Sequence, residues 1–228
     1  MVEPDRPPRS LVATLAALTV VSGFVDAVSF LGLGHVFTAN MTGNVVLIGF
    51  AAAGAPGFSM AASLCALGCF LAGAVAGGRM VRGTNSPRRL LLGAMVLQAG
   101  GVTAAAVVAG LVATIAVGWP RYVVIGVLAA SMGVRNAAVR HLGVPDMSTA
   151  VLTTTLTGLA AQSPLAGGTN PHARLGTTSV LSMFGGALVG AVLVLHAGAT
   201  WSLGIAAGTV GLAAVFFARE VPLGLSTP

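Results

Sequence analysis

Residues 23–44 read GFVDAVSFLGLGHVFTANMTGN, and the architecture of the chain follows from this stretch. Its first part ends a long apolar run, residues 11–33, which contains a single carboxylate, Asp26. Residues 45–53 then form a short apolar piece, which as a helix at 1.5 Å per residue would cover roughly 13 Å. We therefore predict a long helix followed by a half-helix. The residues that open the half-helix are Thr38, Asn40, Thr42, Gly43 and Asn44.

The composition excludes a soluble domain. Of the 228 residues, 56% are hydrophobic and 7% are charged, against roughly 25% charged residues in an ordinary soluble domain. Disorder is excluded as well, because it requires low hydrophobicity and high charge. We predict an all-α polytopic membrane protein. The sequence contains no HExxH, GxSxG, P-loop or convincing dinucleotide-binding motif, so we expect neither an enzyme nor a cofactor or metal site.

Eight apolar segments can be drawn, and two of them are too short to cross a membrane. A spanning helix needs about 20 apolar residues for ~30 Å of hydrocarbon. The second segment is the half-helix described above, and the sixth lies between Pro145 and Pro164 and carries Thr149, Thr153 and Thr154. We predict six transmembrane helices plus two short re-entrant half-helices. The segments are approximately residues 11–33, 37–54, 58–80, 90–117, 121–140, 147–162, 176–197 and 199–218.

The basic residues support this count. The net charge is +6 and every basic residue is an arginine; the arginines flank apolar runs, which indicates membrane orientation rather than nucleic-acid binding. If both half-helices re-enter, only Arg121 lies outside, and the outer loops hold Trp119, Tyr122 and Trp201 as interfacial anchors. Residues 1–10 and 221–228 are then cytoplasmic tails of a multi-pass protein of the bacterial inner membrane. The arginines expected on the cytoplasmic side include Arg79, Arg82, Arg88, Arg89, Arg135, Arg140, Arg174 and Arg219.

Residues 133–155, GVRNAAVRHLGVPDMSTAVLTTT, resemble residues 23–44. With one extra residue in the second copy, Gly23 corresponds to Gly133 and Asp26 corresponds to Asn136. We therefore predict a single membrane domain, residues 11–220, with repeat one at about 11–117 and repeat two at about 121–218. An odd number of crossings in each copy makes the repeat inverted, a recurring transporter plan. Further correspondences are Ala27 with Ala137, Thr38 with Thr149, Thr42 with Thr153, Gly73 with Gly186 and Gly77 with Gly190.

Asp26 is the main candidate for a functional side chain. An ionised carboxylate at membrane depth costs about 2.5–3.5 kcal/mol on insertion scales, so it needs a partner or a watery cavity. One interpretation is that Asp26 binds a cation or takes up a proton while a solute moves. The other is that it only holds neighbouring helices together through hydrogen bonds. Asn136 keeps the hydrogen bonding without the charge.

The openings of the two half-helices are the second candidate. Free backbone N–H groups and the positive end of a helix dipole favour an anion or a carbonyl-rich ligand. In the first copy these residues are Thr38 to Asn44, and in the second they include Thr149, Thr153 and Thr154. The alternative is that the hydroxyl groups cap helix ends and bond back to carbonyl groups.

The motif G-x-x-D-A at Gly23 to Ala27, followed by TGN at Thr42 to Asn44, resembles the signature of the YoaK family of bacterial inner-membrane proteins. Length and hydropathy extend the resemblance over most of the chain. The resemblance implies about six membrane helices, in agreement with the count above, and implies no substrate.

We expect a small secondary transporter of a small polar or anionic solute. Coupling to protons or another cation is expected, because no segment resembles a soluble ATP-binding domain. The alternatives are a passive channel along the same polar seam and a non-transporting membrane scaffold. Glycine-rich helix faces such as Gly73 and Gly77 permit close packing, and a homodimer is expected because six crossings leave little protein around a central site.

Overall fold

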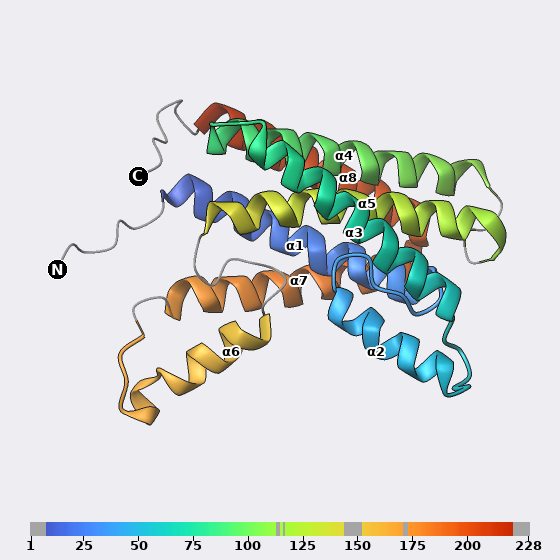
Figure 1. Cartoon of the computed structure of the whole chain (residues 1–228), viewed down its shortest axis with the longest axis horizontal. Coiled ribbons are helices and arrows are strands. Elements are labelled where there is room, and N and C mark those ends of the chain that lie inside the picture. The colour runs from blue at the N-terminus through green and yellow to red at the C-terminus, as the bar shows by residue number, and fades with distance from the viewer. Residues whose placement is uncertain (1–7, 113–114, 116, 144–151, 171–172, 221–228) are drawn as a thin grey trace.

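Helices make up the described part of the chain, residues 8–112, 115, 117–143, 152–170 and 173–220 of the computed structural model, and no strand occurs there. Figure 1 shows the helices lying roughly along one long axis. The prediction of an all-α protein is confirmed. The α-helices are α1 (Arg9–Gly32), α2 (Met41–Ala52), α3 (Met60–Arg82), α4 (Pro87–Leu111), α5 (Gly118–Leu142), α6 (Leu152–Ala161), α7 (Ala173–Ala197) and α8 (Ala199–Glu220).

Six of these helices are long and apolar enough to cross a membrane: α1, α3, α4, α5, α7 and α8. Each has at least 21 residues within its apolar span, which meets the requirement of about 20 residues for ~30 Å of hydrocarbon. The predicted number of membrane helices is therefore confirmed by length and composition. The fourth helix ends earlier than predicted, at Leu111 rather than near residue 117.

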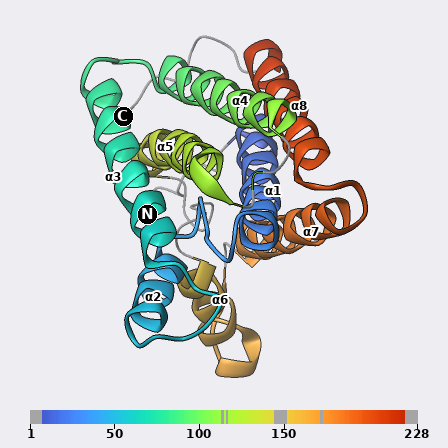
Figure 2. The same ribbon diagram turned by 90° about the vertical axis from the view of Figure 1, so that its right-hand side faces the viewer.

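The remaining two α-helices, α2 and α6, are short, with 12 and 10 residues. In Figure 1 both begin near the middle of the long axis and run toward opposite ends. The chain that leaves α1 returns through α2 to the same end of the bundle before α3 begins. Figure 2 shows α2 and α6 on the same side of the bundle, next to α3 and α7 respectively.

The ends of the helices follow from local chemistry. Ser59 and Ser86 begin α3 and α4 with side-chain oxygens that accept hydrogen bonds from Ala62 N at 3.3 Å and Arg89 N at 3.4 Å, as helix-capping residues do. Helix α5 ends where Gly143 adopts the left-handed conformation, with φ of 64°, which suits a residue without Cβ.

The helices pack in two closely similar crossings, α1 against α7 and α5 against α3. In the first, a Cβ atom on Gly23 would overlap the Met183 carbonyl oxygen, and one on Gly186 would overlap that of Val20. The backbones of the two helices are therefore in direct contact. This is the close approach that small residues at membrane-helix interfaces permit.

The α5–α3 crossing uses glycines in the same way. A Cβ atom on Gly133 would overlap the Phe70 carbonyl oxygen, and one on Gly73 would overlap that of Ala130. Glycine at these positions is therefore required by the close approach of the two backbones. The predicted packing role of Gly73 is confirmed.

Helices α1 and α5 form the centre of the bundle. Within their apolar spans 67% and 61% of residues are buried, against 11% for α7. Helices α4 and α8 pack on each other and on this central pair, as the end-on view in Figure 2 shows. A charged side chain that points inward from α1 or α5 is therefore surrounded by protein.

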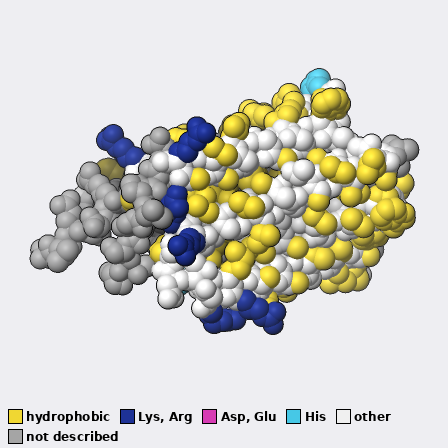
Figure 3. All heavy atoms as spheres, turned by 90° about the horizontal axis from the view of Figure 1, so that it is seen from above, with side chains coloured by type: hydrophobic (Ala, Val, Ile, Leu, Met, Phe, Trp, Pro, Cys, Tyr) yellow, Lys and Arg dark blue, Asp and Glu magenta, His cyan; other side chains and the backbone are white. Residues whose placement is uncertain are grey.

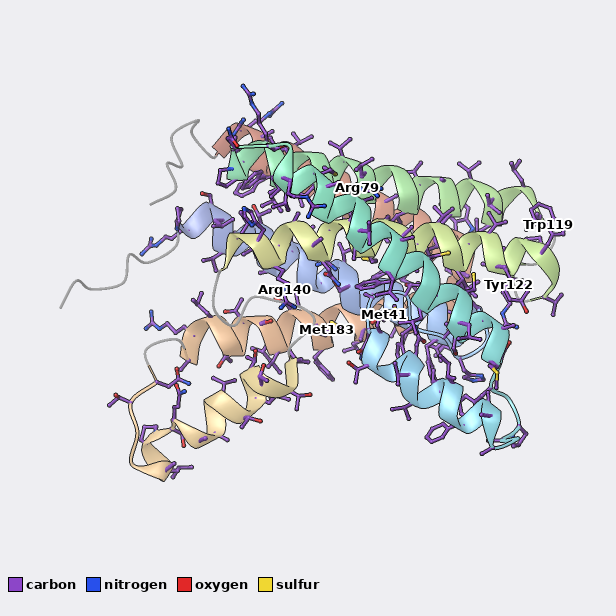
Figure 4. All side chains as sticks on the ribbon, viewed as in Figure 1. Met41, Arg79, Trp119, Tyr122, Arg140 and Met183 are labelled. Carbon is purple, nitrogen blue, oxygen red and sulfur yellow. The ribbon has the colours of Figure 1, made fainter. Side chains whose placement is uncertain are left out.

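Apart from Arg121, which lies beside Tyr122, the exposed arginines and the residues Trp119 and Tyr122 lie at opposite ends of the bundle (Figure 3, Figure 4). Figure 3 shows exposed arginines gathered near one end of the bundle. Figure 4 shows Trp119 and Tyr122 at the opposite end, where Trp119 is 69% exposed. The expectation that Arg135 belongs to the charged end surface is wrong, because Arg135 lies inside α5 and is 0% exposed.

Candidate functional site

Asp26 joins α1 to the loop that leads into α2. The side chain is 4% exposed, and its Oδ1 atom accepts hydrogen bonds from the backbone N–H groups of Thr38 at 3.0 Å and Ala39 at 2.7 Å. These amides lie just before α2 begins at Met41. The carboxylate thus occupies the end of α2 at which the helix dipole favours negative charge. Two of the N–H groups expected to attract an anion are bonded to an anion of the chain itself.

Asn44 fastens the first turn of α2 to the same loop. Its Oδ1 atom accepts a hydrogen bond from Phe37 N at 3.0 Å, and its Nδ2 atom donates to Phe37 O at 2.6 Å. Asn44 is 0% exposed. Gly43 is needed beside it, because a Cβ atom there would lie 2.6 Å from the Phe37 ring. Within the TGN motif, Asn44 therefore holds the loop through hydrogen bonds, and Gly43 leaves room for the Phe37 ring.

The other residues predicted at this opening lie in different surroundings. Thr38 is buried, and no described residue forms a hydrogen bond with its hydroxyl oxygen. Asn40 and Thr42 are exposed on the protein surface. The structure therefore brings Asp26, Thr38 and Asn44 together and leaves Asn40 and Thr42 outside this cluster.

The residues predicted in the second copy are less buried. Asn136 lies on α5 and is half-buried, whereas Thr153 and Thr154 are exposed on α6. The residue of α6 that is buried is Thr155, at 3% exposure. Thr149 lies outside the described residues, so the opening of α6 is compared with that of α2 only from residue 152 onward.

Arg135 is the charged partner of Asp26, and sequence reasoning missed it as a site residue. Its Nη2 atom donates a hydrogen bond to Ser22 Oγ at 2.6 Å and lies 3.5 Å from Met132 Sδ. Ser22 and Asp26 are one turn apart on α1 and so share a face. The two charges attract each other, but in the described part of the chain Asp26 Oδ2 and the Nε and Nη1 atoms of Arg135 have no hydrogen-bond partner.

Gln98 extends this cluster to a third helix, α4. It is 0% exposed, and its Nε2 atom lies 3.4 Å from Met132 Sδ, the sulfur atom that Arg135 also contacts. Its Oε1 atom has no hydrogen-bond partner among the described residues. We call Ser22, Asp26, Gln98 and Arg135 the central polar cluster.

A signal in the sequence pointed to this cluster. Arg135 falls inside the predicted span 121–140, where an ionisable residue suggests a functional site. The positive-inside rule instead assigned Arg135 to the cytoplasmic side, so it was not considered as a site residue. Gln98 lies alone among apolar residues in the span 90–117, and a single amide there carries little information, because only the tertiary fold sets its neighbours.

Other reactive groups do not form a second site in the described part of the chain. Cys65 and Cys69 are free thiols, as expected for two cysteines one turn apart on a helix. The described residues contain no group of three or more His, Cys, Asp or Glu side chains arranged to hold a metal ion.

An assembly of six candidate membrane helices around a buried, oppositely charged pair defines a multi-pass membrane protein. The chain belongs to the family described as "Protein of unknown function (DUF1275)", whose model matches residues 14–216. It is 35% identical over 148 residues to the UPF0700 transmembrane protein YoaK of Bacillus subtilis (strain 168). That alignment covers 64% of this chain and 64% of the relative. The resemblance to the YoaK family is thus confirmed, and no solved structure matches the chain.

Proposed function

We propose that the protein is a small secondary transporter that couples movement of a small polar or anionic solute to a proton or another cation. The observation that carries the proposal is the burial of Asp26 and Arg135 on the two central helices. Each charge at membrane depth costs about 2.5–3.5 kcal/mol on insertion scales, and such residues mark solute or proton pathways in membrane proteins. Packing alone would be served by apolar side chains at lower cost.

The proposed architecture is an inverted repeat with α2 and α6 as re-entrant half-helices. Its support is the matching register of the two glycine crossings. The offset that relates Gly23 to Gly133 also relates Val20 to Ala130, and the offset that relates Gly73 to Gly186 also relates Phe70 to Met183. Transporters built from inverted repeats place discontinuous helices near the midplane, around the solute site.

Asp26 is proposed as the coupling residue. Its carboxylate holds the loop before α2 through two charge-assisted hydrogen bonds, and protonation would weaken both. Helix α2 packs mainly on α3, so release of this loop would free the opening of α2 to move. Uptake of a proton would then change access to the central polar cluster.

In this proposal the protein lies in the bacterial inner membrane, with the arginine-rich end and both termini on the cytoplasmic side. That orientation follows from the excess of arginines at one end and the positive-inside rule. A homodimer is also proposed. Thr42, Thr153 and Thr154 are exposed on the two short helices, and Asn40 is exposed just before α2. A second copy would shield these polar side chains from lipid.

The test is transport by purified protein in liposomes loaded with the pH-sensitive dye pyranine. Gradients of acetate, glycolate, nitrate and phosphate serve as probes. Wild-type protein is expected to move protons together with at least one probe, and Asp26→Asn is expected to abolish the coupled proton movement. Thr19→Ala is the matched control, because Thr19 is a buried residue of α1 that bonds only within its own helix, to Leu15 O at 2.9 Å.

Two outcomes would contradict coupled transport. Flux that persists in Asp26→Asn without pH dependence indicates a passive channel. Absence of flux for every probe favours a membrane scaffold. One observation supports that function: the side chain of Asn44 forms its hydrogen bonds with the Phe37 backbone inside the protein. A scaffold would need these contacts for packing alone.

A further inference from the structure

The central polar cluster contains unpaired donors and unpaired acceptors from three helices. Among the residues that the structure describes, the N–H groups on Arg135 Nε and Nη1 have no hydrogen-bond partner, and the acceptor atoms Asp26 Oδ2 and Gln98 Oε1 have none either. All three residues are at least nine-tenths buried. A buried cation with unsatisfied N–H groups is costly unless it is paired and hydrogen-bonded, so the cluster is suited to a bound polar molecule.

One nitrogen atom of the Arg135 guanidinium is fixed by a hydrogen bond, and the other two have no hydrogen-bond partner among the described residues. Nη2 is held by Ser22 Oγ at 2.6 Å, and Ser22 is itself tied to α1 through a hydrogen bond to Leu18 O at 2.9 Å. Helix α1 therefore positions the guanidinium through Nη2, and the N–H groups on Nε and Nη1 take no part in this contact. A group fixed in advance binds a ligand without a large ordering cost.

The acceptors in the cluster restrict the chemistry of the ligand further. An anion with acceptor atoms alone would satisfy Arg135 but would leave Gln98 Oε1 unpaired and would face the Asp26 carboxylate. A ligand that has both an anionic group and a hydrogen-bond donor satisfies both kinds of atom. Sites built to hydrogen-bond a ligand hydroxyl group discriminate strongly against analogues that lack it, because buried polar atoms are then left unpaired.

We infer that Arg135 and Gln98 form the solute-binding site and that the solute is a small oxyanion carrying a hydrogen-bond donor, such as a hydroxycarboxylate. Arg135 donates to the anionic group and Gln98 Oε1 accepts from the donor. Asp26 lies one turn from Ser22 on the same face of α1, and Ser22 binds Arg135, so protonation of Asp26 is linked to occupancy of this site. The inference rests on the proposed function, since it names the class of solute that the transporter would carry.

The experiment is equilibrium binding to the purified full chain in mild detergent, measured by isothermal titration calorimetry with glycolate and acetate. The two probes differ by a single hydroxyl group. Wild-type protein is expected to bind glycolate at least about tenfold more tightly than acetate, because acetate leaves a buried acceptor unpaired. Gln98→Leu should remove that preference, whereas Arg135→Gln should weaken binding of both probes by about tenfold or more.

A matched control and a second measurement keep the inference falsifiable. Ser63→Ala alters a buried polar residue of α3 and should leave both affinities unchanged. Each variant is checked for a single peak in size-exclusion chromatography, and if Arg135→Gln does not fold, Gln98→Leu and Ser22→Ala carry the test. Equal affinity of wild type for the two probes, or no binding of either, would overturn the inference and assign water to the unpaired atoms.

Binding and flux separate this inference from the proposed function. Glycolate binding that depends on Gln98, without glycolate flux in liposomes, would refute transport and leave the binding site standing. Coupled flux of a probe that is unaffected by Gln98→Leu and Arg135→Gln would refute the site and leave the transporter standing.

Discussion

The α1–α7 crossing and the α5–α3 crossing are alike in packing and different in chemistry. Gly23 and Gly133 meet the partner backbone in the same way in the two crossings. At the corresponding polar positions, however, α1 carries Ser22 and Asp26, whereas α5 carries Met132 and Asn136. Arg135 on α5 corresponds to Val25 on α1. The two crossings thus share their glycine packing, whereas α1 alone carries the carboxylate of Asp26 and α5 alone carries the guanidinium of Arg135.

The glycines that the two crossings share are structural features, and the polar residues that they do not share are chemical ones. Glycine is needed wherever two backbones touch, and both crossings need it. A charge is not needed for packing, and a buried charge without a full set of partners reduces stability. The asymmetric residues, Asp26 and Arg135, are therefore the better candidates for function.

The largest expected effect comes from breaking one crossing. Gly73→Ala would push a Cβ atom into the Ala130 carbonyl oxygen, and overpacking of this kind costs typically 1–3 kcal/mol and occasionally more. We expect loss of the folded monodisperse species or a large fall in melting temperature in detergent. Gly68→Ala, on the same helix with nothing within 4 Å, is the control and should be neutral or slightly stabilising. Equal effects of the two substitutions would contradict the close α3–α5 contact.

A second prediction concerns the charged pair. Arg135→Met leaves the Asp26 carboxylate buried without its opposite charge, and we expect a loss of about 3–5 kcal/mol in the free energy of unfolding. Combining it with Asp26→Asn should recover part of that loss, because the second change removes the uncompensated charge. Denaturant unfolding of the single and double variants measures the coupling, and strict additivity would show that the two charges do not interact.

A third prediction concerns the loop before α2. Asn44→Ala removes both partners of the Phe37 backbone, and each unsatisfied buried group costs about 1–3 kcal/mol. Thr42→Ala, two residues away and exposed, should change the melting temperature little. Similar melting temperatures for the two variants would show that Asn44 does not hold this loop.

The smallest perturbation tests topology and should leave stability unchanged. Single cysteines are placed at Ala55, Gly83, Trp119 and Gly168 in a Cys65→Ala, Cys69→Ala background and labelled in intact cells. Labelling of Ala55Cys and Trp119Cys from outside, with the other two protected, is expected if α2 and α6 re-enter. Protection at positions 55 and 119 with labelling at 83 would mean that the segment containing α2 crosses the membrane, and the inverted-repeat proposal would fall.

The membrane class, the six long helices and the two short ones could be predicted from the amino-acid sequence alone. These follow from apolar content and segment length, which depend on local composition and on bilayer thickness. It also identified Gly73 and Gly186 as contact residues, because small-xxx-small spacing permits close helix contact. Membership of the family could be recognised from the short motifs at Asp26 and Asn44.

Which polar residues meet depends on how the helices pack and could not be predicted from the sequence. Asp26 pairs with amides at the opening of α2, and Arg135 reaches Ser22 on another helix, because the α1–α5 centre brings residues far apart in the chain together. From the sequence, Arg135 was expected at the cytoplasmic surface, because the positive-inside rule counts every arginine near a loop without regard to its burial. Burial and pairing are properties of the packed helices, and the central polar cluster therefore emerged only from the fold.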